Sequence, residues 1–494
     1  MVSADKNGHH SIVRVSGEKA AGRRGRNKFF ITSARFSLLF IFVVLHGCAS
    51  YYERSRQLQT YVVSGDFMNA EKLLEADKKG ETGVNRVLYW FNRGVVAFMN
   101  KEYEKSNYYF SKADRYIEDY RWSIGAEALA LVSNPMVKPY RPEDFEAVMI
   151  HYYMALNYIY LQKYEDALVE ARRINIQLKR MNTRYKNSKN KYAKDAFAHV
   201  LMGLIYEAMG DDNNAFIAYR NALDVYENEY AKLFKIKTPV QLKKDLLRTA
   251  KAMGFEKELK FYEQKFNMKA ETEDPDKGYL VFFWMNGFGP VKGEWSITFY
   301  NAGYHNGWVT FKNADLGLSF PIYVGDRSKD EKNAIANLSV VRVAFPKYIE
   351  RPRMFYDAKL IAGGDVYPLE LAENINAIAF QCLKDRMVRE IASGIARLVT
   401  KKALEELARS KDETIGALVG IFNAFTENAD TRNWQTLPYS ISYARIPFTE
   451  GVHQVELKAY GKNITSASKF EFNIRKGHTT FFAFHQLNTH SVGY

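Results

Sequence analysis

The sequence predicts an α+β multidomain protein, in which an all-α array of helical hairpins precedes a β-rich, sandwich-like C-terminal domain with an inserted helical section. Three observations predict this class. Apolar residues recur three and four positions apart from Tyr51 to about Phe266, which is typical of amphipathic helices. An acidic linker containing Pro and Gly follows at residues 271–278. Runs of β-branched and aromatic residues then alternate with turn residues, which favours strands.

The pattern of basic and apolar residues within positions 1–47 predicts a cleaved signal peptide. A basic stretch at 23–28 precedes an apolar run at 36–45, which is shorter than the roughly 20 residues that a membrane-spanning helix needs. The sequence Leu45-His46-Gly47-Cys48 resembles a bacterial lipobox. That resemblance implies acylation of Cys48, as with palmitate, and the following Ala49 implies transfer to the outer membrane. An uncleaved signal anchor, a buried Cys48 and a start downstream of Met1 remain open.

Charge and cysteine content bear on which ligands and cross-links we expect for this protein. The formal charge is +14, but the leader supplies +6 of it, which leaves +8 on the remaining chain. With no nucleic-acid motif present, this excess indicates a weak attraction to anionic lipid or polymer. Cys382 is the only cysteine besides Cys48, so we expect neither a disulfide within the chain nor a cysteine metal site.

The helical domain, residues 48–270, contains three windows with one spacing. Each window begins with a small residue, and a second small residue follows 12 positions later. An aromatic or small residue comes 4 positions after the second one, and an apolar residue comes 3 positions after that. Small side chains at these positions let paired helices approach closely. The windows are Gly94/Ser106/Phe110/Ala113, Ala155/Ala167/Ala171/Ile174 and Gly203/Ala215/Tyr219/Ala222. This spacing resembles the tetratricopeptide repeat (TPR), with repeats at about 87–120, 148–181 and 196–229.

In TPR proteins the first helix of each repeat lines a concave groove, so the resemblance assigns groove positions here. They include no Lys or Arg, and most are apolar: Leu88, Phe91, Val95, Phe98, Met99, Met149, Tyr152, Leu156, Ile159, Tyr160, Phe197, Val200, Leu204, Glu207 and Ala208. An exposed apolar groove of this size is an aggregation liability. Either another part of the chain fills it, which we favour, or an apolar partner does.

The C-terminal domain, residues 279–494, has strand-like and helical parts. We expect strands at 279–284, 295–300, 308–311, 318–324, 339–345, 440–446, 452–459, 470–474 and 480–484. A helical section at about 369–427 interrupts them, in two parts at about 369–409 and 413–427. The Gly416-x-x-x-Gly420 stretch suits either a membrane-dipping helix or, as we favour, a helix buried against the sheet.

Chemical motifs are sparse, and the sequence predicts no cofactor and no metal ion. It holds no zinc-protease motif, nucleophile elbow or phosphate loop. Glu427, Asp430, Arg432 and Trp434 suggest an ion-paired structural corner that orients the helical section onto the sheet. The alternative is an envelope enzyme acting on glycan or lipid, with Glu427 and Asp430, or His151, as acid and base.

These features together resemble an uncharacterised family of bacterial TPR lipoproteins. The resemblance rests on the second repeat, on Glu143-Asp144-Phe145-Glu146 and on residues 426–438. The resemblance brings no assigned reaction; the leader and the repeats together predict a non-catalytic scaffold at the outer membrane, facing the periplasm, with exposure at the cell surface left open. The expected partners are a protein or peptide and, through the lipid anchor, the membrane. Nucleic acid is not expected, and the sequence does not indicate an oligomeric state.

Overall fold

The computed structural model describes residues 53–119, 136, 138–183, 191–272, 274–411 and 429–487. It divides into two compact units, residues 1–60 and residues 61–494, and the description below concerns the second. The expected leader, Cys48, the helix at 413–427 and Glu427 lie outside the described residues. Within the described part, no helix combines the length and the hydrophobicity needed to cross a bilayer.

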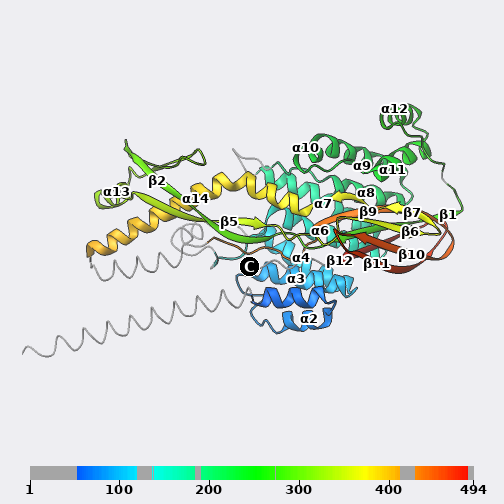
Figure 1. Ribbon diagram of the computed structural model, residues 1–494, viewed down its shortest axis with the longest axis horizontal. Coiled ribbons are helices and arrows are strands. Elements are labelled where there is room, and N and C mark those ends of the chain that lie inside the picture. Colours follow the sequence, from blue (N-terminus) through cyan, green and yellow to red (C-terminus); the bar gives the residue numbers. More distant parts are fainter. Residues whose placement is uncertain are drawn as a thin grey trace, which may run out of the picture. The chain divides into compact units, whose positions relative to one another are not determined.

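The predicted fold class is confirmed: a TPR-like helical array is followed by a β-rich region with a long helix inserted (Figure 1). Each of the three repeat windows holds one antiparallel helix pair. The pairs are α3 (Arg86–Met99) with α4 (Tyr103–Asp119), α6 (Asp144–Tyr160) with α7 (Tyr164–Thr183), and α8 (Ala196–Ala208) with α9 (Asp212–Val225). Helix α2 (Phe67–Glu75) precedes them, and η2 (Tyr226–Tyr230), α10 (Ala231–Leu233), α11 (Val240–Ala252) and α12 (Glu256–Phe266) follow.

The turn inside each pair has one geometry. The second residue after the first helix has a positive φ in all three pairs, namely 63° at Lys101, 58° at Gln162 and 77° at Gly210. A residue in this left-handed conformation ends a helix by turning the chain away from its axis. Two of these helices also begin at a side-chain cap, since Asp195 and Asp211 accept hydrogen bonds from Ala198 N and Asn214 N.

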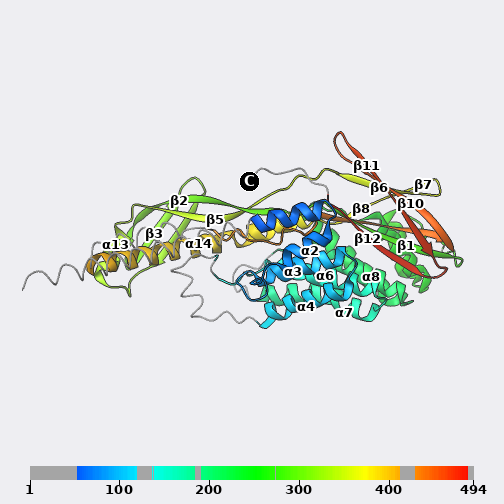
Figure 2. The ribbon, with the colours of Figure 1, turned by 90° about the horizontal axis from the view of Figure 1, so that it is seen from below.

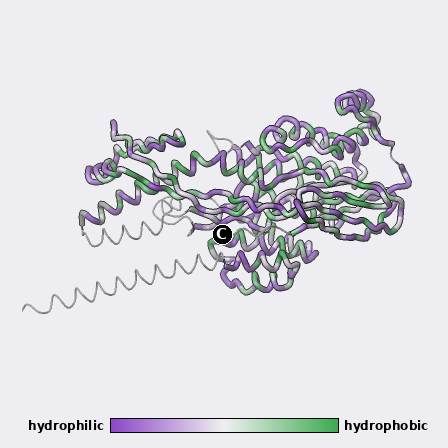
Figure 3. Tube along the Cα trace, in the orientation of Figure 1, coloured by the Kyte–Doolittle hydropathy of each residue, from purple (hydrophilic) through white to green (hydrophobic). Residues whose placement is uncertain are grey.

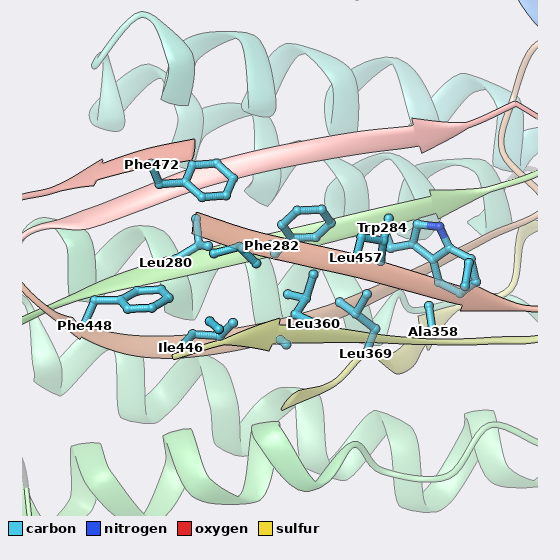
Figure 4. Close-up of a cluster of buried hydrophobic side chains, with 14 of the residues drawn as sticks. Leu280, Phe282, Trp284, Ala358, Leu360, Leu369, Ile446, Phe448, Leu457 and Phe472 are labelled. Carbon is cyan, nitrogen blue, oxygen red and sulfur yellow. The ribbon is translucent and has the colours of Figure 1, made fainter. Parts of the chain in front are cut away.

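Two four-stranded sheets form the expected sandwich. The first has the order β12-β1-β9-β8 and the second β11-β10-β6-β7. Figure 4 shows the apolar side chains of both sheets, among them Phe282, Leu360 and Leu457, converging in the core between them. The strands are β1 (Lys277–Asn286), β6 (Asp357–Ala362), β7 (Asp365–Pro368), β8 (Glu370–Glu373), β9 (Ser440–Thr449), β10 (Gly451–Tyr460), β11 (Thr465–Ile474) and β12 (Thr479–Gln486).

A third sheet, β4-β3-β2-β5, packs on the inserted helix rather than in the sandwich. Its strands are β2 (Val291–His305), β3 (Trp308–Asn313), β4 (Leu318–Tyr323) and β5 (Val340–Ile349), and α13 (Lys329–Ala336) lies between β4 and β5 in the chain. Helix α14 (Ile375–Lys411) runs alongside these strands (Figure 2). It buries Ile391, Ile395 and Val399 against the sheet.

Two features of the C-terminal region differ from the expectation. The helical section does not begin at Leu369, because residues 370–373 pair with β9 as strand β8, and α14 begins only at Ile375. Strands β6 and β7 were also not expected. Gly363 and Gly364 connect them as a hairpin, with φ values of 60° and 93°.

Hydrophobic and hydrophilic residues alternate at short intervals along most helices and strands (Figure 3), as amphipathic elements do. Two elements depart from this pattern. In β1 every residue from Leu280 to Asn286 is buried, and in α6 all but one residue from Phe145 to Ile159 is buried. An element buried all round has neighbours on every side. These two elements therefore mark the centre of the packing between the repeats and the sandwich.

Candidate interaction site on the repeats

The concave face of the repeats is closed by the chain itself. The expected groove residues of the three first helices are largely buried, with exposed fractions of 0% at Phe91, 2% at Tyr152 and 2% at Phe197. Two parts of the C-terminal region cover them: the extended segment of residues 429–439, here called the plug segment, and the sheet face formed by β1 and β9. The structure thus shows that this groove is filled from within.

The plug segment inserts an aromatic anchor into the first two repeats. The indole of Trp434 is 2% exposed and stacks on Phe91 at 4.2 Å between ring centroids. Its centroid also lies 5.8 Å from that of Phe110 and 5.9 Å from that of Tyr153. Trp434 Nε1 donates a hydrogen bond to Thr436 Oγ1 at 2.9 Å, so the indole keeps a polar partner after burial.

The third repeat packs against the sandwich. In β1, Leu280, Phe282 and Trp284 point into the sandwich core, so the intervening residues point the other way. One of them, Phe283, meets the ring of Phe197 at 5.9 Å between centroids. Strand β9 also contacts the third repeat, since the ring centroid of its Tyr443 lies 6.3 Å from that of Phe197. The sheet is therefore a middle layer, with the second sheet on one face and the repeats on the other.

Buried charges fix the plug segment to α6. The carboxylate of Glu146, which is fully buried, accepts hydrogen bonds from Trp434 N at 2.7 Å and from Glu143 N at 2.8 Å, and also from Tyr140 Oη. Glu143 pairs with Lys292 and, at 2.5 Å, with Arg386. Burial raises the pKa of Glu146. For Glu143 burial acts in the same direction, but the two cations outweigh it and lower the pKa.

Arg432 and Asp430, two residues of the expected corner, form an ion pair at 2.6 Å. The guanidinium is 1% exposed and also donates to Asn85 Oδ1 at 2.8 Å and to the Lys138 carbonyl at 3.1 Å. Both of these acceptors precede repeat helices. The expectation that this corner holds the helical section on the sheet stays a prediction, since Glu427 lies outside the described residues, while the contacts above hold Arg432 beside the repeats.

A second buried charge cluster joins the third repeat to β9. Glu207 of α8 accepts hydrogen bonds from Arg445 at 2.6 Å and from Arg248 at 2.9 Å, and Asp245 pairs with Arg248 at 2.8 Å. Burial alone would raise the pKa of Glu207, but the two guanidinium groups lower it to about 2. The carboxylate is therefore ionised at neutral pH, and its negative charge is paired with the two arginines inside the protein.

Two buried acids lie near each other between α8 and β8. Asp195 accepts a hydrogen bond from Tyr192 Oη at 2.6 Å, and Glu373 accepts one from Tyr230 Oη at 2.9 Å. Burial raises the pKa of both carboxyl groups, and the charge of Asp195 raises the pKa of Glu373 further. Tyrosine hydroxyls and backbone N–H groups donate to these two acids, and because such donors are neutral the pair differs from the two clusters above.

The small residues of the repeat windows lie where the paired helices meet. A Cβ at Gly94 would stand 2.6 Å from the Phe110 ring, and one at Gly203 would overlap the Tyr219 ring. Ser106 Oγ donates to the Gly94 carbonyl at 2.8 Å. The remaining window residues are buried as well: Ala113, Ala155, Ala167, Ala171, Ile174, Ala215 and Ala222. Each first helix therefore approaches its partner through a position that admits little or no side chain.

Two residues of the enzyme alternative, His151 and Asp430, have different partners in the described part of the chain. His151 is 0% exposed, and its Nδ1 lies 2.7 Å from Glu170 Oε2, while its Nε2 lies 3.6 Å from Asp114. Asp430 is paired with Arg432, and Glu427 lies outside the described residues. In the part of the chain that the structure describes, His, Cys, Asp and Glu form no cluster suited to a metal ion.

One pocket of about 600 Å³ lies among α11, the linker and strands β1, β7 and β9. Its cations are each close to an acid: Lys244 to Glu271 at 2.7 Å, Lys277 to Asp274 at 3.7 Å, Arg248 to Asp245 and Arg445 to Glu207. Because these charges are balanced by acids of the chain, the pocket offers no clear preference for an anion or a cation.

Comparisons with known proteins add little beyond the repeat architecture. No family model matches the chain, and no curated protein matches it. Among solved structures, the apo form of RapI is similar with 16% identity over 44% of this chain and 68% of that one, at a TM-score of 0.32. BtubC (BKLC) from P. vanneervenii is similar with 16% identity over 49% and 93%, at a TM-score of 0.31. A MamA structure is similar with 15% identity over 43% and 88%, at a TM-score of 0.28.

The internal closure of the groove was only partly visible in the sequence. The apolar groove positions indicated that something must cover them, but Trp434 was assigned to a corner and not to the groove. One signal could have located the covering sheet. Residues 280–285 are an unbroken apolar run, which is typical of a strand buried on both faces.

Proposed function

We propose that this protein is a membrane-anchored cell-envelope lipoprotein whose TPR-like array acts as a non-catalytic scaffold for a protein partner. The acyl chains on Cys48 hold it at the outer membrane, facing the periplasm. Stable anchoring takes more than one acyl chain, and anchoring raises the effective concentration of the repeats near membrane-bound partners. The lipobox-like Leu45-His46-Gly47-Cys48 and the repeats support this proposal together.

The closed groove carries the argument about where a partner binds. Trp434 and the β1–β9 face occupy the surface that an open TPR array offers to a peptide. A partner that leaves this packing intact therefore binds the outward surface of the second helices. Exposed apolar side chains are present there: Tyr108 of α4 is 53% exposed, and Val169 and Ile176 of α7 are 50% and 60% exposed.

Val169 and Ile176 form the core of the proposed contact. They are seven residues apart, so they lie on one face of α7, two turns from each other. Exposed apolar side chains that share a helix face are the usual anchors of a helix-mediated interface. The proposal gives no catalytic role to His151 or Asp430, because the first is enclosed and the second is held by an arginine.

Affinity capture after crosslinking, with the acylated full chain taken from membranes, tests the scaffold. The wild type is compared with a Val169→Glu/Ile176→Glu variant and with Val452→Glu, a control on β10 where the side chain is 63% exposed. We expect the wild type and the control to capture the same protein and the double variant to lose it. Capture that is unchanged in the double variant contradicts a contact on α7.

Mass spectrometry of the mature N-terminus tests the anchor separately. The expected product begins at an acylated Cys48, and Cys48→Ser is expected to leave the protein unmodified and to release it from membranes. An intact, unacylated N-terminus in the wild type contradicts the anchoring part of the proposal.

A further inference from the structure

The β4-β3-β2-β5 sheet has one face packed on α14 and a second face with exposed aromatic residues. Val309, Phe311, Phe299 and Val341 point toward α14 and are buried. Their neighbours along the strands point the other way, because side chains alternate across a sheet. These neighbours and further strand residues on the same side form the outer face: Glu294, Ser296, Thr298, Tyr300, His305, Trp308, Thr310, Lys312, Ser319, Pro321, Tyr323, Val340, Arg342 and Ala344.

The strand register makes this outer face continuous. Tyr300 is directly opposite Lys312 on one side and Val340 on the other, and Lys312 is opposite Ser319. One row therefore crosses all four strands. Nearby, Trp308 is opposite Tyr323, with ring centroids 5.1 Å apart.

Large aromatic and apolar side chains of the outer face are open to solvent. The exposed fractions are 60% for Tyr300, 44% for Trp308, 49% for Tyr323 and 45% for Val340. Several such residues on one face of a sheet mark an interaction surface more often than scattered single residues do.

The fixed charges beside the exposed rings are positive. Lys312 is opposite Tyr300 and Arg342 is opposite Thr298, while the one carboxylate of the outer face, Glu294, lies six residues before Tyr300 on β2 and accepts a hydrogen bond from Ala429 N at 2.6 Å. Arg342 Nε donates to Ser296 Oγ at 2.7 Å, and neither cation has an ion pair with any residue that the structure describes. Asp326, just beyond β4, borders the face and accepts a hydrogen bond from Tyr323 at 3.5 Å.

We propose that this outer face contacts a lipid bilayer that carries anionic headgroups. Tyr and Trp have amphipathic rings that settle at the level of the headgroups, and nearby Lys and Arg are attracted to anionic lipid. The inference rests on the proposed membrane location of the protein, but it does not require acylation of Cys48.

Other occupants fit the outer face less well. A second copy bound through the same face by two-fold symmetry would bring cations toward cations. A glycan is held by several hydrogen bonds from side chains that flank an aromatic platform. Beside its rings this face offers hydroxyl groups of Ser and Thr and the His305 imidazole but no amide group, and its one carboxylate, Glu294, already accepts a hydrogen bond from Ala429 N. A membrane surface needs only the rings and the positive charges.

A site-specific fluorescence experiment tests the contact. The full chain carries Cys48→Ser in every arm, and Tyr300→Cys is labelled with an environment-sensitive dye; Cys382 is 2% exposed and does not compete for the label. The matched control is Val452→Cys. Vesicles of phosphatidylglycerol and phosphatidylethanolamine, with brominated acyl chains as quenchers, are compared with phosphatidylcholine vesicles.

We expect lipid quenching at position 300 with the anionic vesicles, and neither at position 452 nor with phosphatidylcholine. Adding Lys312→Gln and Arg342→Gln should weaken the binding that gives this quenching by a factor on the order of 25. Thermal unfolding shows whether the variants remain folded. Because no arm can be acylated, this result is independent of whether Cys48 is lipidated in the wild type.

Three results overturn the proposal. The first is equal quenching at positions 300 and 452, which places no special contact at the outer face. The second is a dye response that rises with protein concentration in the absence of lipid, which indicates a second copy. The third is an equal response to dextran sulfate without vesicles, which indicates a soluble polyanion.

Discussion

The Trp434 indole stacks on the Phe91 ring at 4.2 Å and an interplanar angle of 27°, although 343 positions separate the two residues in the sequence. Phe91 belongs to the first helix of the first repeat, and Trp434 follows the inserted helical section. Their contact therefore links the beginning of the repeat array to a segment that the chain reaches only near its end. It makes the array and the sandwich parts of one packed core.

Trp434→Ala is expected to destabilise the protein by about 3–5 kcal/mol, because it removes a buried indole and leaves a cavity that its aromatic neighbours cannot fill. Urea unfolding of the purified full chain measures this change. Trp308→Ala is the matched control, since that side chain is 44% exposed, and its effect is expected to stay within about 0.5 kcal/mol. Equal midpoints for Trp434→Ala and the wild type would mean that the plug segment does not stabilise the fold.

Glu207→Gln is expected to destabilise the protein by about 3–5 kcal/mol, because the change leaves Arg248 and Arg445 buried without their shared carboxylate. The comparison is Glu256→Gln, which removes an acid that is 81% exposed and lies 3.8 Å from Lys260. That exposed pair is expected to contribute less than about 1 kcal/mol. Similar losses in the two variants, measured by urea unfolding, would contradict the assignment of Glu207 as the centre of the cluster.

Gly94→Ala separates helix propensity from packing. Propensity alone favours Ala over Gly inside a helix by about 1 kcal/mol, but the new methyl group would stand 2.6 Å from the Phe110 ring. Overpacking typically costs about 1–3 kcal/mol, so we expect a net loss of stability.

A double-mutant cycle with Phe110→Leu checks the cause of that loss. The smaller side chain makes room for the methyl group, so Gly94→Ala should cost less in the Phe110→Leu background than in the wild type. Additive losses would mean that the two helices do not meet at this position.

The helical hairpins could be predicted from the sequence because their determinants are local. Small residues such as Gly94 and Gly203, and the apolar period of the helices, occur within windows of about one repeat. The expected strands at 279–284 and 440–446 lie within β1 and β9 for the same reason. A run of β-branched and aromatic residues bounded by turn residues is a signal read from neighbouring positions.

The remaining features depend on distant partners. Residues 370–373 were expected to be helical because the helical spacing of apolar residues continues into them. In the structure they pair with β9 and form a strand. In the sequence, Glu207 is a polar residue among mostly apolar groove positions. Only the folded structure brings Arg248 and Arg445 within hydrogen-bond distance of it. The role of Trp434 likewise depends on three rings from helices that are distant in sequence.

Glu373 predicts a specific dependence of stability on pH. Burial raises its pKa well above 4.5 in the folded protein, so the folded state holds a proton that the unfolded chain releases. The stability associated with that proton is fully present below pH 4.5 and is lost as the pH rises toward the folded-state pKa. Between these limits each pH unit removes about 1.4 kcal/mol from the free energy of unfolding.

Glu373→Gln replaces the protonated carboxyl with a neutral group that can still accept the hydrogen bond from Tyr230. We therefore expect the variant and the wild type to differ little near pH 4, and the variant to gain on the wild type as the pH rises. Urea unfolding at a series of pH values measures this difference. Glu471→Gln, an exposed position on β11, removes the same charge and should give a constant offset. A constant offset for Glu373→Gln as well would show that folding does not raise the pKa of this carboxyl group.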